Sequence, residues 1–325
     1  MMEREDYYEV AERISDYCLE IFGDNIQSVI LYGSVATKDF IPNPTWTDID
    51  FIVVLKAIIE EQIEREEKKL DDISLKIGHR FHWLRSSSGY ALIGPSLETE
   101  ESLWRKQTDF GYPVIWLNGV LNAYNVLYGE DILKLFHQVP IDKIDALYTF
   151  MTTRRHQLMW QTVWKKEKEN GITINEAIPI IKDAIFATKN FLHYHGINLY
   201  RKPEIIKTFL KEFPKHDLKN LLNNILKAQE KDLDPKRKTD SEMLVFLAQE
   251  SDRFVSKLAT DLNLPHAATS PKLYLYLDKY MNQATRYLYK SVIEHVILMN
   301  EGNLAEAAQY DQLMKWLEEK NKQLL

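Results

Sequence analysis

Cysteine is almost absent from this chain. The only one among 325 residues is Cys18, so neither an intramolecular disulfide nor a cysteine-based zinc site can form. Cys18 lies within residues 17–22, where apolar side chains recur at helical spacing, and this context indicates a small buried side chain rather than a nucleophile. Any reactive site must therefore be built from other residue types.

Long apolar runs and an export signal are also lacking. Runs such as residues 51–55 are much too short to cross a bilayer. The opening residues MMEREDYYEV do not contain the basic and then apolar stretches of a secretory signal. We therefore expect a cytoplasmic protein with no membrane partner.

Positive charge is not in excess. The 41 lysine and arginine residues are outnumbered by 48 aspartate and glutamate residues, which gives a net charge of −7. Because a nucleic-acid-binding surface needs a broad excess of basic residues, this balance disfavours a nucleic-acid partner. The hydrophobic fraction of 45% and the charged fraction of 27% are ordinary for a globular protein, and the length is enough for two domains.

The first third of the chain alternates helical and strand-like patterns. Apolar residues at helical spacing predict a helix over residues 6–22, and β-branched runs predict buried strands over residues 28–32 and 49–55. A charged helix over residues 58–70 and a third strand over residues 73–84 are predicted next. This order predicts an α+β fold, in which a small mixed β-sheet carries flanking helices.

From about residue 115 the pattern is helical throughout. Apolar stripes at helical spacing lie within residues 144–163, 177–191 and 277–296. They predict an all-α helical-bundle domain after the sheet.

The composition changes near Pro140. We therefore expect a first domain over residues 1–140, which carries the sheet. A helical substrate-binding or interaction domain is expected over residues 141–325.

The clearest chemistry lies after the first predicted strand. Gly33 directly follows residues 28–32, so the backbone can turn sharply there and approach a ligand without a Cβ in the way. We expect Ser34 to cap a short helix that begins at Val35, whose free N–H groups favour a phosphate together with the serine hydroxyl. Gly33 and Ser34 are therefore predicted to hold the phosphates of a nucleotide.

Two acids stand at the entrance of the second predicted strand. Asp48 and Asp50 are two residues apart, so their carboxylates project from the same face of a strand. Such a pair repels itself unless a cation lies between the two charges. Mg²⁺ is the natural cation, because one or two carboxylates and substrate phosphate oxygens hold it. Asp48 and Asp50 are therefore predicted as metal ligands and catalytic residues of a phosphoryl or nucleotidyl transfer site.

Together these features resemble the DNA-polymerase-β-like nucleotidyltransferase superfamily, whose signature is a Gly-Ser pair followed by Asp-x-Asp on the next strand. The sequence is most similar to the antibiotic-type and minimal nucleotidyltransferases, in the form LYGSxA and then (S/T)DID. Residues 31–34, Ala36 and residues 47–50 match this form, and residues 127–131 (LYGED) resemble a segment near the end of that domain. The resemblance covers roughly the first 130 residues and implies an ATP-binding or other nucleoside-triphosphate-binding enzyme that uses Mg²⁺.

The sequence departs from this family in three places. The linker from the Gly-Ser pair to the two acids is at the long end of the family's range and is stiffened by two prolines. Thr37 and Lys38 stand where the family usually has a basic residue and then glycine. Active members usually carry a third carboxylate on the next strand, whereas no acid occurs within residues 73–84. The candidates for a third ligand are Asp72, just before that predicted strand, and His82, within it. The alternative for His82 is a purely structural role. This departure leaves a non-catalytic domain as an alternative.

The resemblance implies transfer of a nucleoside monophosphate to a hydroxyl of a small molecule, with an aminoglycoside-like acceptor among the candidates. Two alternatives stay open: an AMPylating, protein-modifying enzyme of the toxin–antitoxin type, and a non-catalytic nucleotide-binding or interaction module. A homodimer is compatible with the sequence. Glu98, Glu100 and Glu101 are candidates for a general base, although an exposed, acid-rich helix start is the ordinary explanation for them and is favoured.

Overall fold

The computed structural model describes residues 3–43, 46–58, 62–84, 93–109, 112–143, 145–147, 149–154, 174–215, 219–231 and 237–262. The chain forms two compact units. Unit 1 combines Met1–Pro140 with Ala228–Asp232, and unit 2 combines Ile141–Lys227 with Leu233–Leu325. Unit 1 contains the sheet, and the described part of unit 2 is helical.

Unit 1 is built on a four-stranded mixed sheet in the order β3-β2-β1-β4. Its strands are β1 (Ile26–Tyr32), β2 (Ile49–Leu55), β3 (Ile93–Thr99) and β4 (Tyr124–Gly129). β1 runs antiparallel to β2 and to β4, whereas β2 and β3 are parallel. The two central strands, β1 and β2, are almost entirely buried, which accounts for their nearly continuous apolar sequences.

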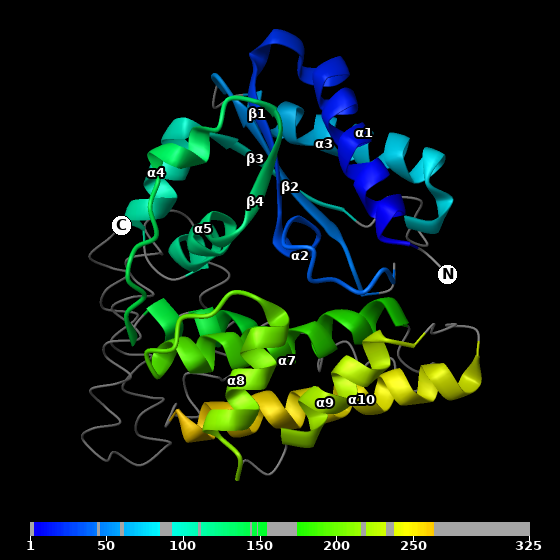
Figure 1. Ribbon diagram of the computed structural model, residues 1–325, viewed down its shortest axis with the longest axis vertical. Helices are drawn as coiled ribbons and strands as arrows, with labels where there is room; N and C mark the ends of the chain where they lie inside the picture. The colour runs from blue at the N-terminus through cyan, green and yellow to red at the C-terminus, as the bar shows by residue number, and fades with distance from the viewer. Residues whose placement is uncertain are drawn as a thin grey trace, which may run out of the picture. The chain divides into compact units, whose positions relative to one another are not determined.

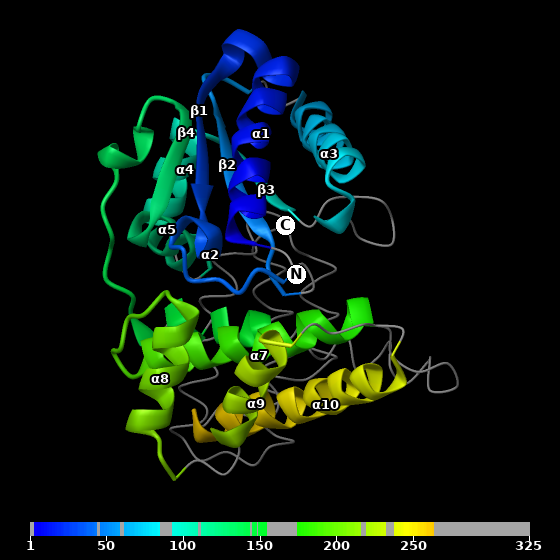
Figure 2. The same ribbon diagram turned by 45° about the vertical axis from the view of Figure 1, so that its right-hand side comes forward.

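Helices cover both faces of this sheet, as Figures 1 and 2 show. On one face lie α1 (Arg4–Phe22) and α3 (Ile63–Arg80), and on the other lie α4 (Glu100–Thr108) and α5 (Tyr112–Asn122). Short helical turns complete the described part of the unit: α2 (Gly33–Ala36), η1 (Gly23–Asn25), η3 (His82–Leu84) and η4 (Ile132–Leu135). The predicted α+β fold, a mixed sheet with flanking helices followed by further helices, is confirmed.

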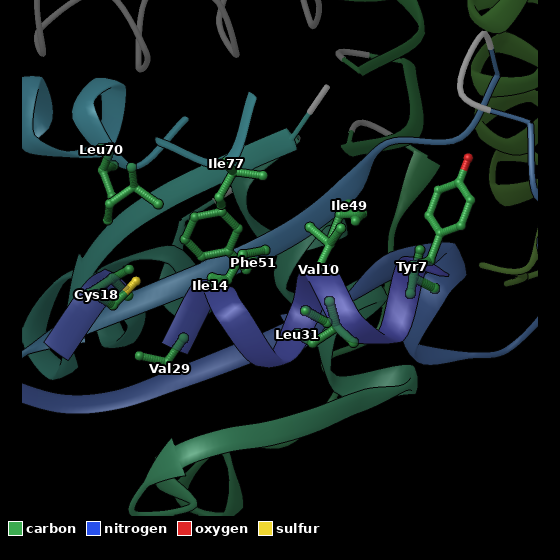
Figure 3. Packing of buried hydrophobic residues seen from close by; sticks show 14 of the residues in the cluster. Tyr7, Val10, Ile14, Cys18, Val29, Leu31, Ile49, Phe51, Leu70 and Ile77 are labelled. Atoms are coloured by element: carbon green, nitrogen blue, oxygen red, sulfur yellow. The ribbon is translucent and has the colours of Figure 1, made fainter. Parts of the chain in front are cut away.

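The larger core of unit 1 lies between the sheet, α1 and α3. The buried residues Val10, Ile14 and Cys18 recur at helical spacing on α1, and they pack against Val29 and Phe51 of the sheet (Figure 3). Cys18 is fully buried, and this burial raises the pKa of its thiol to about 12. The cysteine is therefore a small hydrophobic core residue, as its sequence context indicated.

The strand predicted over residues 73–84 is wrong, because α3 occupies most of that stretch. Ile73, Leu75 and Ile77 alternate as in a strand, but the buried hydrophobic side chains of the helix are Leu70, Ile73 and Ile77, at helical spacing. Leu75 is only partly buried. Two periodicities compete in this stretch, and packing of the helical stripe against the core decides between them.

The third strand is β3, further along the chain, and β4 occupies a stretch that we predicted as helical. β3 is only partly buried and contains Gly94 and Pro95, two residues that weaken a strand pattern. β4 lies at the edge of the sheet and is partly exposed, so it lacks a continuous apolar run. Neither strand therefore has the apolar signature that identified β1 and β2.

Unit 2 contains α7 (Ile174–Tyr194), α8 (Lys202–Glu212), α9 (Lys219–Gln229) and α10 (Lys238–Asp261) in its described part, with α7 packed against α8 and α10. The stripe predicted within residues 177–191 is confirmed, since these residues of α7 are all buried: Ala177, Ile181, Ala184, Thr188 and Phe191. The stripe within residues 277–296 lies outside the described residues. Among the helices that the structure describes, none combines the length and apolarity needed to cross a bilayer.

Candidate active site

The turn after β1 is formed at Gly33. Its φ of 75° lies in the left-handed region that residues with a side chain disfavour, so the chain leaves β1 and enters α2 within one residue. A Cβ placed on Gly33 would lie 2.6 Å from Oδ2 of Asp50, so the Asp50 carboxylate lies directly against this glycine. The structure thus brings the turn and one of the two predicted acids together.

Ser34 lies inside α2 rather than in front of it. We expected it to cap a helix beginning at Val35, but the helix begins at Gly33, Tyr32 takes the N-cap position and no side chain caps it. The capping role is therefore wrong, because the left-handed backbone at Gly33 starts the helix one residue before Ser34. The carbonyl of Ser34 accepts a hydrogen bond of 2.9 Å from Oγ1 of Thr37.

Asp50 is the second residue of β2 and faces the side of the sheet covered by α4 and α5. Side chains two residues apart on a strand share a face, and Ile52 and Val54 belong to the core cluster on that side. The β3 residue opposite Asp50 is Gly94, and a Cβ on Gly94 would collide with Oδ1 of Asp50. The carboxylate is therefore seated between two glycines, with Gly33 against one oxygen and Gly94 against the other.

Tyrosine hydroxyls surround the two acids. Burial and the charge of Asp50 raise the pKa of Tyr32, and burial and the charge of Asp48 raise the pKa of Tyr7. Tyr112, at the start of α5, is half exposed, and desolvation by the surrounding protein and the charge of Asp50 raise its pKa as well. Because a negative charge disfavours ionisation of a nearby phenol, the three hydroxyls are protonated hydrogen-bond donors at neutral pH.

The Tyr7 hydroxyl is a buried donor in this neighbourhood. Its side chain is fully buried, and its oxygen has no hydrogen-bond partner among the described residues. The ring packs against Phe40 and Trp83, with centroid distances of 4.9 Å and 5.0 Å. Figure 3 shows the hydroxyl directed away from the apolar cluster of α1.

No third carboxylate reaches this edge of the sheet within the part of the chain that the structure describes. The acid of β3 is Glu98, which lies opposite Val54 in the register, four residues beyond Gly94. That separation along a strand is about 13 Å. Consistent with this, the described residues contain no group of three or more histidine, cysteine, aspartate or glutamate side chains that could hold a metal ion.

Glu98 instead anchors a buried polar network. It accepts hydrogen bonds of 2.6 Å from both Ser96 and Ser102, and it pairs with Nζ of Lys106 at 2.7 Å and 2.8 Å. Only 3% of Glu98 is exposed. A buried carboxylate with all of these partners is a structural ion pair rather than a general base, because its charge is already compensated.

The other residues considered from the sequence lie apart from Asp50. Asp72 is exposed on α3, which covers the opposite face of the sheet, and His82 is exposed in η3. Glu100 and Glu101 form the first turn of α4, so the simple explanation of an acid-rich helix start holds for them. The two acids at this edge of the described sheet are Asp48 and Asp50.

Lys38 adopts a left-handed backbone at the position where the resembling family usually has glycine. It has a φ of 59°, in the left-handed region, where a residue with a side chain is strained. The guanidinium of Arg4 holds the loop, since it donates to the carbonyl oxygens of Lys38 at 2.9 Å and of Phe40 at 3.2 Å. The departure from the family pattern at Lys38 therefore leaves the left-handed turn in place.

Comparison with known proteins yields one clear sequence relative. A protein of Methanocaldococcus jannaschii, named provisionally as the protein adenylyltransferase MJ1305, is 30% identical over 114 residues. The match covers 35% of this chain and 66% of the relative, just under two thirds of its length. This chain resembles the nucleotidyltransferases. The resemblance predicted from the Gly-Ser and Asp-x-Asp signature is thus confirmed.

No family model matches the chain. Among solved structures, spectinomycin adenyltransferase AAD(9) from Enterococcus faecialis, with ATP and spectinomycin, aligns with a TM-score of 0.46 and 13% identity. That alignment covers 75% of this chain and 98% of the other.

Two features of the candidate site could not be predicted from the sequence. Gly94 could not be assigned, because its place opposite Asp50 follows from the register of a strand that begins beyond residue 90. The aromatic setting of Tyr32 depends on Trp116 of α5, far along the chain. An aromatic residue directly before a Gly-Ser pair is the one signal that could have pointed to Tyr32.

Proposed function

We propose that this protein transfers a nucleoside monophosphate from a nucleoside triphosphate, with ATP as the first candidate, to a hydroxyl acceptor. The main observation behind the proposal is that the Asp50 carboxylate lies directly against Gly33, at the turn after β1. An acid at the mouth of this turn can bind a cation that bridges to phosphates held at Gly33 and Ser34. The 30% identity to a protein named as an adenylyltransferase supports the same reaction.

The donor set at this edge of the sheet fits Mg²⁺. Asp48 and Asp50 supply carboxylate oxygens, and Mg²⁺ is held in proteins by one or two carboxylates together with phosphate oxygens and water. Bound there, the ion would neutralise phosphate charge and favour departure of pyrophosphate. Because glycines flank both of its oxygens, Asp50 would present them in one fixed orientation.

In the proposed reaction the acceptor oxygen forms a bond to the α-phosphorus while the bond between the α-phosphorus and the bridging oxygen breaks. Pyrophosphate leaves with that electron pair, and the acceptor hydroxyl gives up its proton to solvent water. Gly33 and Ser34 would bind phosphate oxygens through backbone N–H groups, aided by the Ser34 hydroxyl. The neutral tyrosine hydroxyls near Asp48 and Asp50 add hydrogen-bond donors without adding charge.

The acceptor proposed first is a hydroxyl of a small molecule, with unit 2 as the substrate-binding or interaction domain. A protein side chain is the second candidate, and the name of the Methanocaldococcus jannaschii relative favours it. Incubation with labelled ATP and cell lysate separates the two. A labelled protein band supports the protein acceptor, whereas a labelled small product supports the first candidate.

A thermal-shift screen tests the proposal itself. We expect one of the four nucleoside triphosphates, with Mg²⁺, to raise the melting temperature, since a ligand at a hundred times its Kd stabilises by about 2.7 kcal/mol. Asp50→Asn should lose this shift, whereas the matched change Asp72→Asn, at an exposed position of α3, should keep it. The proposal fails when no triphosphate shifts the wild type, or when Asp50→Asn responds like the wild type.

Release of pyrophosphate distinguishes an enzyme from a nucleotide-binding module. The wild type with its preferred triphosphate, Mg²⁺ and an acceptor should release pyrophosphate. A thermal shift without any release, across small-molecule and lysate acceptors, would instead favour the non-catalytic alternative.

A further inference from the structure

Tyr32 stands beside Asp50 in a single row across the sheet. It is the last residue of β1, and the register places it opposite Asp50 on β2 and opposite Tyr124 on β4. Residues opposite one another in neighbouring strands point to the same face. The Tyr32 side chain therefore emerges on the α4–α5 face next to the Asp50 carboxylate, and it is the longer of the two side chains.

The oxygen of Tyr32 is already used as an acceptor. Nε1 of Trp116 donates to it at 3.3 Å, and the two rings meet edge to face with centroids 5.7 Å apart. An indole N–H can only donate, so the phenol proton cannot return to Trp116. Among the described residues no hydrogen bond takes that proton, which leaves Tyr32 as a donor with its oxygen held in place.

Trp116 is itself fixed by the buried network of Glu98. Nζ of Lys106 lies 5.5 Å from the centroid of the Trp116 ring, a distance at which a cation attracts the face of an indole. The same ammonium group is paired with the buried Glu98 carboxylate. The position of the Tyr32 hydroxyl is thus supported through contacts that reach back to the core of unit 1.

The phenol of Tyr32 is a neutral donor. A tyrosine side chain is ordinarily protonated at physiological pH, and burial of Tyr32 favours the same neutral form. Thr37 stands where the resembling family usually has a basic residue, so position 37 offers no cation to a triphosphate, and the lysine of this stretch, Lys38, comes one residue later. A fixed neutral donor next to Asp50 is suited to the same task.

We propose that the Tyr32 hydroxyl, held by Trp116, donates a hydrogen bond to a phosphate oxygen of the nucleoside triphosphate bound at Asp48 and Asp50. This inference rests on the proposed function. Tyr32 is then a nucleotide-binding residue and Trp116 is a positioning residue that acts through it. The acceptor of the phenol proton is supplied by the ligand.

Calorimetric titration with the preferred Mg²⁺-triphosphate tests this assignment on the full-length chain. Tyr32→Phe removes only the hydroxyl, and loss of one hydrogen bond to a charged phosphate should raise the Kd about tenfold or more. The matched control is Tyr124→Phe, because Tyr124 occupies the same row and face but its hydroxyl donates to Oδ1 of Asp131 at 3.0 Å. Tyr124→Phe should leave the Kd unchanged.

Two further measurements separate a binding role from a structural one. The melting temperature of ligand-free Tyr32→Phe should stay within the range of Tyr124→Phe, since each variant loses one protein hydrogen bond, the one from Trp116 to Tyr32 or the one from Tyr124 to Asp131. Trp116→Phe keeps an aromatic ring but removes the N–H, so it should raise the Kd in the same direction and by less. The inference is overturned if Tyr32→Phe binds the triphosphate like Tyr124→Phe while the wild type binds it. If the wild type itself does not bind, the proposed function has failed instead.

Discussion

The orientation of the Asp50 carboxylate depends on two glycines, Gly33 and Gly94. Gly33 begins α2 and Gly94 belongs to β3, yet each leaves the space that one oxygen of the carboxylate occupies. A side chain at either position would have to displace the carboxylate or the strand. The site therefore depends on close backbone approach as much as on the acids.

Gly94→Ala tests this packing directly. Gly94 does not have a positive φ, so alanine brings a steric conflict with Asp50 and no backbone strain. We expect a loss of about 1–3 kcal/mol in the free energy of unfolding, typical of overpacking, together with a weaker thermal shift by Mg²⁺ and triphosphate. Urea unfolding and the thermal-shift assay measure the two effects.

A double-mutant cycle supplies the control. When Asp50→Ala has already removed the carboxylate, Gly94→Ala should cost clearly less, because the colliding oxygen is gone. Equal costs in both backgrounds would show that the conflict lies elsewhere and would contradict this arrangement.

At the scale of single elements, continuous apolar strands and simple helical stripes were predictable. β1 and β2 are buried on both faces, so each carries a nearly continuous apolar run, and α1 shows one unbroken helical stripe. The acids and the Gly-Ser turn attach to these elements, and for that reason the pair and the turn could be assigned together. Residues 73–84 carry two periodicities at once, and only packing within the folded unit selects the helix.

β3 and β4 show why the rest of the site was less predictable. Their pairing partners lie far away in the sequence, and the partial exposure of both strands removes the apolar signal. Gly94 acquires its meaning only from its register with Asp50. Such information is contained in the tertiary structure and not in any local pattern.

Helix α7 contains a histidine that should make unit 2 sensitive to acid. His193 is 1% exposed, and Nε2 lies 3.0 Å from the carbonyl oxygen of Leu199, whereas Nδ1 has no partner among the described residues. Burial and the nearby charge of Lys189 lower the pKa of His193 from 6.5 to about 4. This buried environment, close to the charge of Lys189, stabilises the neutral imidazole and disfavours the protonated one.

The direction of the pH effect follows from that lowered pKa. Between pH 4 and 6.5 the unfolded chain binds this proton and the folded chain does not, so stability decreases as the pH falls below 6.5. At pH 5 the loss relative to neutral pH is about 2 kcal/mol. His193→Gln, which keeps a donor but cannot be protonated, should reduce the difference between urea midpoints at pH 7 and pH 5.

The exposed neighbour His195 serves as the matched control. His195→Gln should leave most of the acid sensitivity of the wild type in place, because that imidazole is exposed to solvent. A pH dependence that is the same in His193→Gln as in the wild type would rule out His193 as its source.

At the scale of the whole molecule, unit 1 is not one continuous piece of chain. Residues 228–232 belong to it, although almost ninety residues of unit 2 precede them. Asn43, in the loop before β2, is 8% exposed, and its amide donates to the carbonyl oxygens of Lys231 at 2.9 Å and of Gln229 at 3.5 Å. These bonds tie a late segment to the loop that leads to Asp48.

Asn43→Ala should therefore destabilise the full-length chain by about 1–3 kcal/mol, because it removes two part-buried hydrogen bonds that contribute about 0.5–1.5 kcal/mol each. Asn25→Ala is the comparison: its amide also donates to a carbonyl, that of Ala57 at 3.1 Å, but the bond is exposed. A change within about 0.5 kcal/mol is expected there. Urea unfolding of the two variants would refute the role of Asn43 if their losses were equal.

The late segment has a consequence for synthesis on the ribosome. A nascent chain that has emerged only as far as Pro140 already contains the whole sheet, but it lacks residues 228–232 and therefore the acceptors that Asn43 meets in the finished protein. The loop between α2 and β2 can reach its final state only after α7, α8 and α9 have been translated and the chain extends to Lys231. During translation, unit 1 can therefore be completed only once a segment from the last third of the chain has been synthesised.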